Sequence, residues 1–372
     1  MGLEVIEKIS HKYGGDSNFV LAGGGNTSFK DEKYLYIKGS GTALATITKD
    51  GFVKMSREAL ASIWTKTYSN DKDKRESEVL SDMMASKCVG EEAKRPSVET
   101  LLHNLFSQPY VLHVHPAIVN GLTCSQDGED AMKKMFPNAI WVNETEPGYI
   151  LASKCRTLIN EYEATTGQKA NLLFLQNHGI FFAANNETEM NNLVLSVMSE
   201  FNKKTKKAPD FSACKYDEEK ANKVKAAFEI ACEGSYVKFT YNKEIKALCK
   251  SKETFDVLLR PFTPDHIVYC KSVPMFAEAI NCQNCAKKAI NEFAEKNGFM
   301  PKVVFVKNIG MLTIGKNEKD AQTVSDVWLD AIKISIYSQN FGGPRYMAPE
   351  MVDFIANWEV ENYRSKVALE NK

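Results

Sequence analysis

Three histidines are the residues of this sequence whose type and spacing most directly suggest chemistry. His113 and His115 lie two residues apart in a β-rich run at 110–115. Side chains two apart on a strand point to the same face, so the two imidazoles project side by side. The pair does not identify a third ligand by itself, but His178 lies beside Gly179 in a turn that can bring its ring back to the pair. Because three protein ligands and one open position are typical of catalytic zinc sites, the triad predicts Zn²⁺ or another divalent transition metal.

Glu99 is a carboxylate near the start of a predicted helix. Pro96 and Ser97 have residue types suited to the first helical positions, and an apolar stripe follows them up to Phe106. The positive end of the helix dipole stabilises a carboxylate in the first turn, so a purely structural acid is one interpretation of Glu99. His103 lies one helical turn further on, and we interpret it as a supporting residue and not as a ligand.

Two glycine-rich turns, at 21–28 and 38–42, flank a predicted strand at 33–38. Exposed backbone N–H groups in such turns can hold a phosphate, although tight turns without a ligand explain the same residues. A dinucleotide-binding fingerprint is a poor match, because Leu44 stands where the third glycine is required.

Short strands that alternate with helices must position these residues. The predicted strands lie at 33–38, 110–115, 171–175 and 303–306, and two of the predicted helices at 99–106 and 187–201. A lysine run that ends at Pro209 predicts a domain boundary. We therefore expect an α/β protein with a first domain at 1–208 and a second α/β domain at 209–372.

The second half of the sequence contains an echo of the first. Residues 173–189 align without gaps on 304–320, with five identities and a nearly continuous match of the apolar pattern, and His178 corresponds to Ile309. A weaker echo pairs 35–38 with 268–271. Our hypothesis is a duplication whose second copy kept the scaffold and lost the metal. Chance similarity of two strand-turn-strand segments is the alternative.

Composition excludes several classes of partner and places the protein in the cytoplasm. With 47 basic and 47 acidic side chains, no footprint for nucleic acid is visible. No run approaches the roughly 20 apolar residues that span a bilayer, and the first residues do not have the pattern of a signal peptide. The nine cysteines are predicted to be reduced thiols. Cys282 and Cys285 suit half a zinc site or a redox pair, but a structural role is favoured because no second Cys-x-x-Cys accompanies them.

Five motifs in a fixed order resemble those of the class II aldolase/adducin family. They are Gly-Gly-Gly-Asn-Thr-Ser, Lys-Gly-Ser-Gly-Thr, Pro-Ser-Val-Glu-Thr-Leu-Leu-His, His-Val-His-Pro and Gln-Asn-His-Gly, across residues 21–179. The later stretch at 262–271 is similar to the aldolase portion of bifunctional rhamnulose-phosphate aldolase/short-chain dehydrogenase proteins. The family includes fuculose-phosphate and rhamnulose-phosphate aldolases.

The resemblance implies a three-layer α/β/α domain around a mostly antiparallel sheet. It also implies a homo-oligomer, with the tetramer as the usual form. It implies metal ligands at His113, His115 and His178, a catalytic Glu99, and contacts to substrate or phosphate from Asn26, Thr27, Ser40, Gly41 and Ser97. One position departs from the pattern: Val98 stands where many sugar-phosphate aldolases have a second serine, so one hydroxyl donor is missing.

The function that the resemblance implies is metal-dependent cleavage of a ketose 1-phosphate into dihydroxyacetone phosphate and a short aldehyde. The expected partner is therefore a small sugar or sugar phosphate. A sugar-phosphate 4-epimerase or a dehydratase of the same fold is the alternative enzyme, and glutamate at position 99 favours the aldolase over the epimerase. A non-catalytic, adducin-like binding protein is the alternative of another class.

Overall fold

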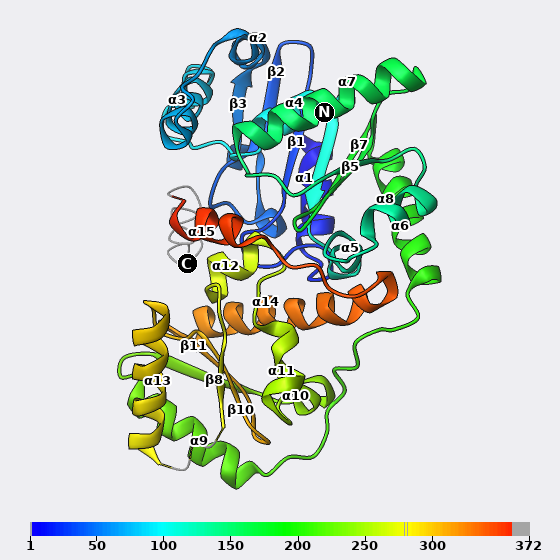
Figure 1. Ribbon diagram of the computed structural model, residues 1–372. Coiled ribbons are helices and arrows are strands. Elements are labelled where there is room, and N and C mark those ends of the chain that lie inside the picture. The colour runs from blue at the N-terminus through cyan, green and yellow to red at the C-terminus, as the bar shows by residue number, and fades with distance from the viewer. Residues whose placement is uncertain (1, 279, 281, 359–372) are drawn as a thin grey trace. The chain divides into compact units, whose positions relative to one another are not determined.

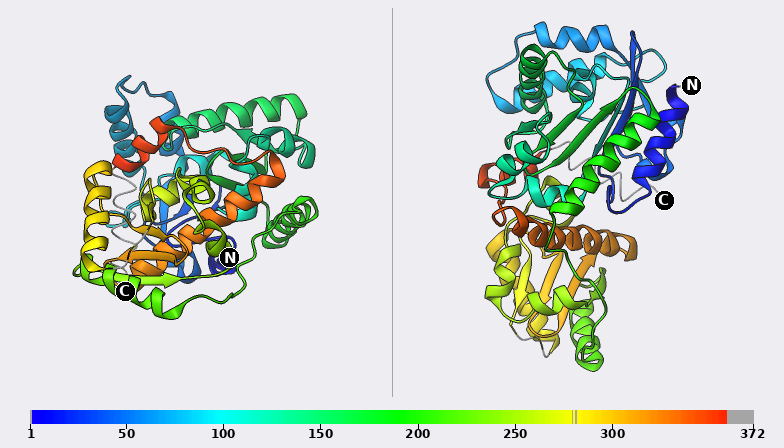
Figure 2. Two further views of the ribbon diagram at one scale, coloured as in Figure 1. Left: turned by 60° about the horizontal axis from the view of Figure 1, so that its bottom comes forward. Right: turned by 90° about the vertical axis from the view of Figure 1, so that its right-hand side faces the viewer.

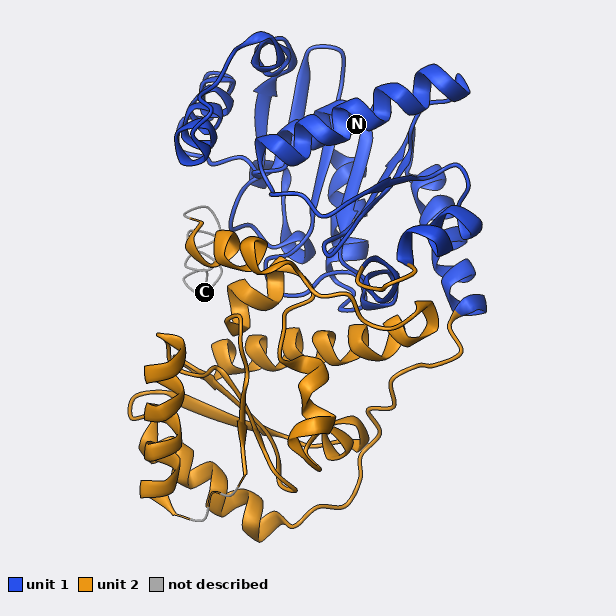
Figure 3. Ribbon diagram, viewed as in Figure 1, with its two compact units in different colours: residues 1–123, 128–204, 362–372 blue, residues 124–127, 205–361 orange. Residues whose placement is uncertain are grey.

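Residues 2–278, 280 and 282–358 are described by a computed structural model of the chain (Figure 1). Two compact units share them: unit 1 holds residues 2–123 and 128–204, and unit 2 holds residues 124–127 and 205–358 (Figure 3). Each unit has its own sheet. Within these ranges, none of the helices is long and apolar enough to cross a bilayer.

Unit 1 is built on a seven-stranded sheet with the order β3-β2-β1-β4-β7-β6-β5. Neighbouring strands are antiparallel, apart from the parallel pair β5 and β6. This confirms the mostly antiparallel sheet that the family resemblance implies. The strands are β1 (Asn26–Lys30), β2 (Tyr34–Lys38), β3 (Phe52–Ser56), β4 (Tyr110–Val114), β5 (Ile140–Val142), β6 (Leu172–Leu175) and β7 (Gly179–Ala184).

Helices cover both faces of this sheet and complete the predicted three layers (Figure 2). On one face, Leu102 of α4 and Ile159 of α7 pack into a buried cluster with Val111 and Phe181 of the sheet. On the other face, α1 packs against β1 and α8 against β7. The helices of unit 1 are α1 (Gly2–Gly14), α2 (Arg57–Ser62), α3 (Lys72–Ala85), α4 (Thr100–Leu105), α5 (Ala117–Thr123), α6 (Gly128–Met135), α7 (Tyr149–Thr166) and α8 (Glu187–Lys204).

The start of α4 differs from the prediction that placed Pro96 and Ser97 at its first positions. Pro96 forms an isolated antiparallel bridge with Gly39, and the Ser97 amide donates to the carbonyl oxygen of Lys38 at 3.1 Å. Pairing of this extended segment with the end of β2 competes with helix formation, so α4 begins only at Thr100. As a consequence, Glu99 lies immediately before the helix.

Unit 2 is built on a four-stranded sheet with the order β8-β11-β10-β9. Its strands are β8 (Tyr236–Thr240), β9 (Met275–Ala277), β10 (Val303–Val306) and β11 (Gly310–Gly315). Its helices are α9 (Glu218–Ala231), α10 (Lys243–Leu248), α11 (Lys252–Phe255), α12 (Pro264–Cys270), α13 (Gln283–Asn297), α14 (Glu318–Tyr337) and α15 (Pro349–Asn357). The weaker sequence echo does not correspond to a structural repeat, because 35–38 lie in β2, whereas 268–270 belong to α12 and Lys271 is its C-cap. Thr263 and His266 form a capping box there, and Pro264 occupies the first helical turn.

The sheet of unit 2 repeats the last four strands of unit 1. The order β4-β7-β6-β5 corresponds to β8-β11-β10-β9, with two antiparallel pairs followed by one parallel pair in each case. The hairpin registers also agree: Leu175 pairs with Gly179 in unit 1, and Val306 pairs with Gly310 in unit 2. The strand pairing that a duplication requires is therefore present.

Backbone hydrogen bonds around the two hairpins agree one for one. The amide of Asn177 donates to the Thr123 carbonyl at 3.1 Å, and the amide of Asn308 donates to the Cys249 carbonyl at 2.8 Å. Both asparagines have the left-handed conformation, with φ of 54° and 58°. The strand registers then place Phe239 where unit 1 has His113, which explains why the second sheet lacks the triad.

Asn308 gives a test of this turn geometry. A left-handed residue with a Cβ costs roughly 1–2 kcal/mol, but Asn adopts this conformation more readily than Ala, and Gly adopts it freely. Asn308→Ala should therefore lower the free energy of unfolding by about 1 kcal/mol, and Asn308→Gly should leave it nearly unchanged. Urea unfolding of the two variants measures the difference. An equal loss of unfolding free energy in both variants would show that Asn308 does not stabilise the turn through its left-handed backbone conformation.

Candidate metal centre

Three imidazoles from two separate segments of unit 1 converge at one end of its sheet. His113 is the fourth residue of β4, His115 follows the strand, and His178 lies in the turn between β6 and β7. One nitrogen atom from each ring lies within 4.8 Å of those of the other two. His113 Nε2 and His115 Nε2 are 2.9 Å apart, and the ring centroids of His113 and His178 are 5.0 Å apart. The three histidines that the sequence singled out are therefore brought together.

A backbone carbonyl orients the most deeply buried of these rings. His113 is fully buried, stacks on Phe181 with 4.0 Å between ring centroids, and has its Nδ1 3.0 Å from the carbonyl oxygen of Ile180. A carbonyl oxygen only accepts, so Nδ1 carries the proton, and Nε2 is the ring nitrogen that points toward His115. Histidines that bind metals are commonly held in this way. The role of Ile180 has no signal in the sequence, because it acts through its backbone.

Glu99 is the acidic residue beside this triad. Its Oε1 lies 3.4 Å from His113 Nε2 and 3.5 Å from His178 Nε2. The side chain is buried, and Oε1 has no hydrogen-bond partner among the described residues. Its other oxygen, Oε2, accepts a hydrogen bond from Asn26 Nδ2. One carboxylate oxygen is therefore fixed, and the other faces the imidazoles.

A buried hydrogen-bond chain behind Glu99 fixes the protonation state of His103. Asn26 donates from Nδ2 to Glu99, so its Oδ1 accepts from His103 Nε2. His103 Nδ1 then accepts from the Ser28 hydroxyl at 2.8 Å. Burial lowers the pKa of His103 well below its usual range, in agreement with this neutral ring. His103 supports Glu99 through Asn26 and lies outside the imidazole triad, as the sequence analysis interpreted it.

The predicted phosphate-binding residues lie on three segments, which the structure brings partly together. Ser97 Oγ lies 3.3 Å from Asn26 Nδ2, and the Ser40 amide donates to the Arg95 carbonyl at 2.7 Å. Gly41, with φ of 83°, is next to Ser40 in the same turn. Thr27 differs from the others. Its fully buried hydroxyl is 2.7 Å from Ser10 Oγ of α1, because alternate side chains of β1 point to opposite faces.

Two glycines let the backbone approach the triad closely. Gly25 has φ of 65°, and a Cβ there would lie 2.9 Å from the His113 carbonyl oxygen. A Cβ on Gly179 would lie 2.6 Å from His115 Cδ2 and 2.7 Å from the Val114 carbonyl oxygen. The residue after His178 must therefore be glycine for the three rings to keep this spacing.

Gly179→Ala is expected to weaken metal binding by about tenfold or more, because changes that only shift metal ligands cost about 10–100-fold. The reason is the contact of the new methyl group with the His115 ring. A zinc titration in competition with a chromophoric chelator measures the affinity. Gly167→Ala is the control for a glycine replacement that causes no clash: its φ of 68° makes alanine strained there, but a Cβ has no neighbour within 4 Å. Equal affinities in both variants would contradict the expectation.

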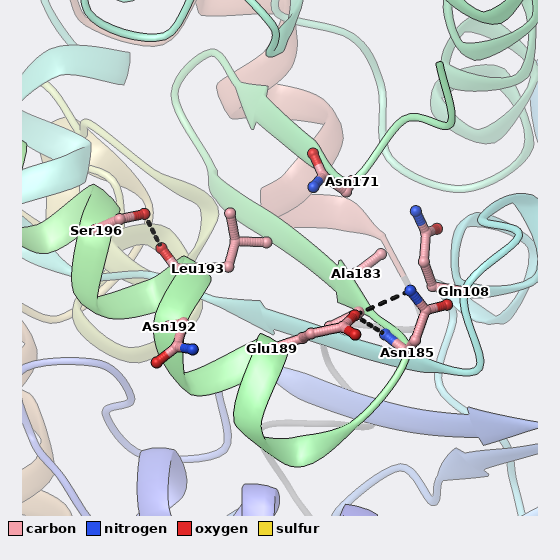
Figure 4. A pocket seen from close by; sticks show the side chains of 9 residues that line it. Gln108, Asn171, Ala183, Asn185, Glu189, Asn192, Leu193 and Ser196 are labelled. Carbon is pink, nitrogen blue, oxygen red and sulfur yellow. Dashed lines mark hydrogen bonds between the residues drawn. The ribbon is translucent and has the colours of Figure 1, made fainter. Parts of the chain in front are cut away.

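A hollow of about 390 Å³ lies at the other end of β7 (Figure 4). Carboxamides line much of it, and Oε1 of the buried Gln108 has no hydrogen-bond partner among the described residues. The acidic residue in its lining, Glu189, accepts hydrogen bonds from Asn185 and Asn186. The hollow contains no histidine or cysteine among its described lining residues, so it offers none of the chemistry of the triad.

Comparison with known proteins identifies the class of protein. Residues 5–198, a little more than half of the chain, match the family described as Class II Aldolase and Adducin N-terminal domain. The chain therefore belongs to the class II aldolase and adducin family. It is also 21% identical over 419 residues to an uncharacterized oxidoreductase, YuxG, of Bacillus subtilis (strain 168). That alignment covers 99% of this chain but 58% of the relative, so this chain spans a little more than half of the relative's length.

Two solved structures are among those similar to this chain. The N-terminal class II aldolase domain of a conserved protein from Thermoplasma acidophilum is 22% identical, with a TM-score of 0.46 over 55% of this chain and 93% of that chain. An L-fuculose-1-phosphate aldolase from Thermus Thermophilus is 12% identical, with a TM-score of 0.34 over 54% of this chain and 90% of that chain.

Proposed function

We propose that this protein is a divalent-metal-dependent aldehyde-lyase. In this proposal it cleaves a ketose 1-phosphate into dihydroxyacetone phosphate and a short aldehyde. One observation carries the proposal: three converging imidazoles lie beside a buried carboxylate oxygen that has no hydrogen-bond partner among the described residues. Membership of the class II aldolase and adducin family supports the same reaction class.

The side chains of the triad suit a cation of borderline softness. Neutral imidazoles are the usual ligands of Zn²⁺, and three of them leave a position open for substrate. In this proposal His113, His115 and His178 hold Zn²⁺ or another divalent transition metal. The ion would supply Lewis-acid polarisation of a substrate carbonyl.

Glu99 is the proposed acid/base. Its Oε1 faces the imidazole cluster, so it can exchange a proton with the carbon that becomes nucleophilic when the carbon–carbon bond breaks. Asn26 holds Oε2 of the carboxylate and limits its rotation. Because Asn26 is itself fixed by the neutral His103, the orientation of Glu99 is set before substrate arrives.

The segments beside Glu99 are the proposed binding site for the substrate and its phosphate. Asn26 and Ser97 offer polar side chains next to the carboxylate, and Ser40 and Gly41 lie in the turn that pairs with the segment before Ser97. Thr27 is the fifth residue that the sequence analysis predicted to contact substrate or phosphate. Since its hydroxyl bonds Ser10, we assign its side chain to the packing of α1 on β1.

The remaining features of the proposal concern the whole protein. Residues 1–208 would form the catalytic domain, and residues 209–372 a second domain without metal ligands. The protein would act in the cytoplasm on small sugars or sugar phosphates. It would be a homo-oligomer, with the tetramer as the expected form.

A substrate screen tests the proposal. The purified protein is incubated with ketose 1-phosphates and with the matching free ketoses, and aldehyde release is measured with and without a chelator. We expect release from at least one phosphorylated ketose and its loss after chelation, with recovery when Zn²⁺, Mn²⁺ or Co²⁺ is added. A stereoisomer without aldehyde would identify a 4-epimerase, and loss of water would identify a dehydratase. Purified protein that holds far less than one metal ion per chain, and has no activity, would favour an adducin-like binding protein.

A further inference from the structure

A pair of cysteines marks the connection between two parallel strands of unit 2. Cys282 and Cys285 are joined by a disulfide, contrary to the prediction that all nine cysteines are reduced. Cys282 is the N-cap of α13, the helix that connects β9 to the parallel strand β10. Its Sγ accepts a hydrogen bond from the Cys285 amide at 3.1 Å. Cys282 is exposed and Cys285 is half-buried, so solvent reaches the pair.

The fold does not require this bond. The matching connection of unit 1 joins the parallel strands β5 and β6 through α7, which follows Gly148 and has no cysteine in its first turn. Helix α13 is also held by its own apolar face, since Ala286 and Ile290 are buried in the core of unit 2. A bond within one helical turn closes a very short loop, so it adds little to stability through chain entropy. The pair therefore calls for an explanation other than structural support.

The position of the pair favours thiol–disulfide exchange. A Cys-x-x-Cys motif in a strand–helix–strand unit, with its first sulfur at the start of the helix, has the surroundings that stabilise a thiolate. The bonded sulfurs and the placement between parallel strands are separate observations, and both point to the same chemistry.

Five of the other cysteines have opposite surroundings, because they are buried. Burial raises the pKa of Cys155 and Cys249 to about 12, and that of Cys232 to about 11. Protonated, enclosed thiols of this kind are poor nucleophiles. Among the described cysteines, Cys282 is the one that combines exposure with a position at the start of a helix.

We propose that Cys282 and Cys285 form a redox site that exchanges electrons with a low-molecular-weight disulfide of the glutathione class. The Cys282 thiolate attacks one sulfur of the small disulfide, breaks its sulfur–sulfur bond and releases the first small thiolate. The Cys285 thiolate then attacks Cys282 Sγ, which closes the protein disulfide and releases the second small thiolate. Two electrons pass to the small disulfide, and the two protons of the dithiol go to the two released thiols.

Equilibration in glutathione buffers tests the proposal. The full-length protein is incubated at ratios from reduced glutathione alone to oxidised glutathione alone, then quenched with acid and alkylated. Mass spectrometry counts the alkyl groups on the peptide that contains residues 282–285. We expect this peptide to change from two alkyl groups to none within the series, while Cys88 and Cys214, which are half-buried, keep theirs. Two alkyl groups at every ratio would overturn the proposal, and so would a disulfide that survives every ratio.

Single variants separate the two steps. Cys285→Ser should accumulate one glutathione per chain on Cys282, because the resolving thiol is absent. Cys282→Ser should leave Cys285 to react at least about tenfold more slowly, because that sulfur is half-buried. Cys214→Ser is the matched control and should behave as the wild type does. Equal rates in the two variants would remove the proposed order of attack. Metal content is an independent readout and should be the same in all variants. The redox test and the lyase test can therefore fail separately.

Discussion

Glu99→Gln is expected to lower turnover by about two to four orders of magnitude, the usual contribution of a positioned acid or base. Glutamine has the shape of glutamate, and its carbonyl oxygen can still accept the hydrogen bond from Asn26. The amide cannot take a proton from carbon. Because the three imidazoles are untouched, the metal content should stay at the wild-type level.

Two measurements check this prediction. The rate of aldehyde release gives turnover, and metal analysis of the same preparation gives occupancy. Glu189→Gln is the control: Glu189 accepts hydrogen bonds from Asn185 at the far end of β7, so its loss should leave turnover unchanged. A Glu99→Gln enzyme with the wild-type rate would remove Glu99 from the mechanism. A low rate together with lost metal would assign Glu99 to metal binding.

Local sequence patterns predicted those parts of the fold in which one segment determines its own structure. The run at 303–306 is the strand β10, and the periodic segment that begins at Glu187 is the helix α8. The predicted start of α4 was wrong. The Ser97 amide donates to the carbonyl oxygen of Lys38, which lies far earlier in the chain, and this bond competes with helix formation. Long-range pairing of that kind is not visible in the composition of a segment.

The imidazole triad was predictable for two different reasons. Alternation on a strand places His113 and His115 together, and this needs no knowledge of the rest of the chain. His178 reaches them because β7 pairs with β4, with Phe181 beside His113. Register between distant strands cannot be deduced from spacing, so the family motif was the stronger guide. The hydrogen-bond chain through Ser28, Asn26 and His103 had no signature in the sequence, because it depends on which side chains face α4.

The two hairpins differ in chemistry and agree in geometry. In unit 1 the residue between the left-handed asparagine and the glycine is His178, and in unit 2 it is Ile309. Both hairpins have equivalent registers and equivalent hydrogen bonds to the end of a preceding helix or the residue after it. The backbone of this turn therefore accepts either a polar ring or a branched aliphatic side chain.

His178→Ile uses this correspondence to remove one imidazole without disturbing the turn. We expect metal affinity to fall by more than about a hundredfold, because changes in residues that merely orient ligands already cost about 10–100-fold. Turnover should fall with the metal and should not recover fully when metal is added in excess. The thermal unfolding midpoint measured without metal should stay close to that of the wild type, since Ile309 occupies the same turn position in unit 2. His11→Ala is the control, because His11 bonds the Ile47 carbonyl and lies outside the triad. Wild-type metal affinity in the His178→Ile protein would mean that the cation, if one binds, is held without the third imidazole.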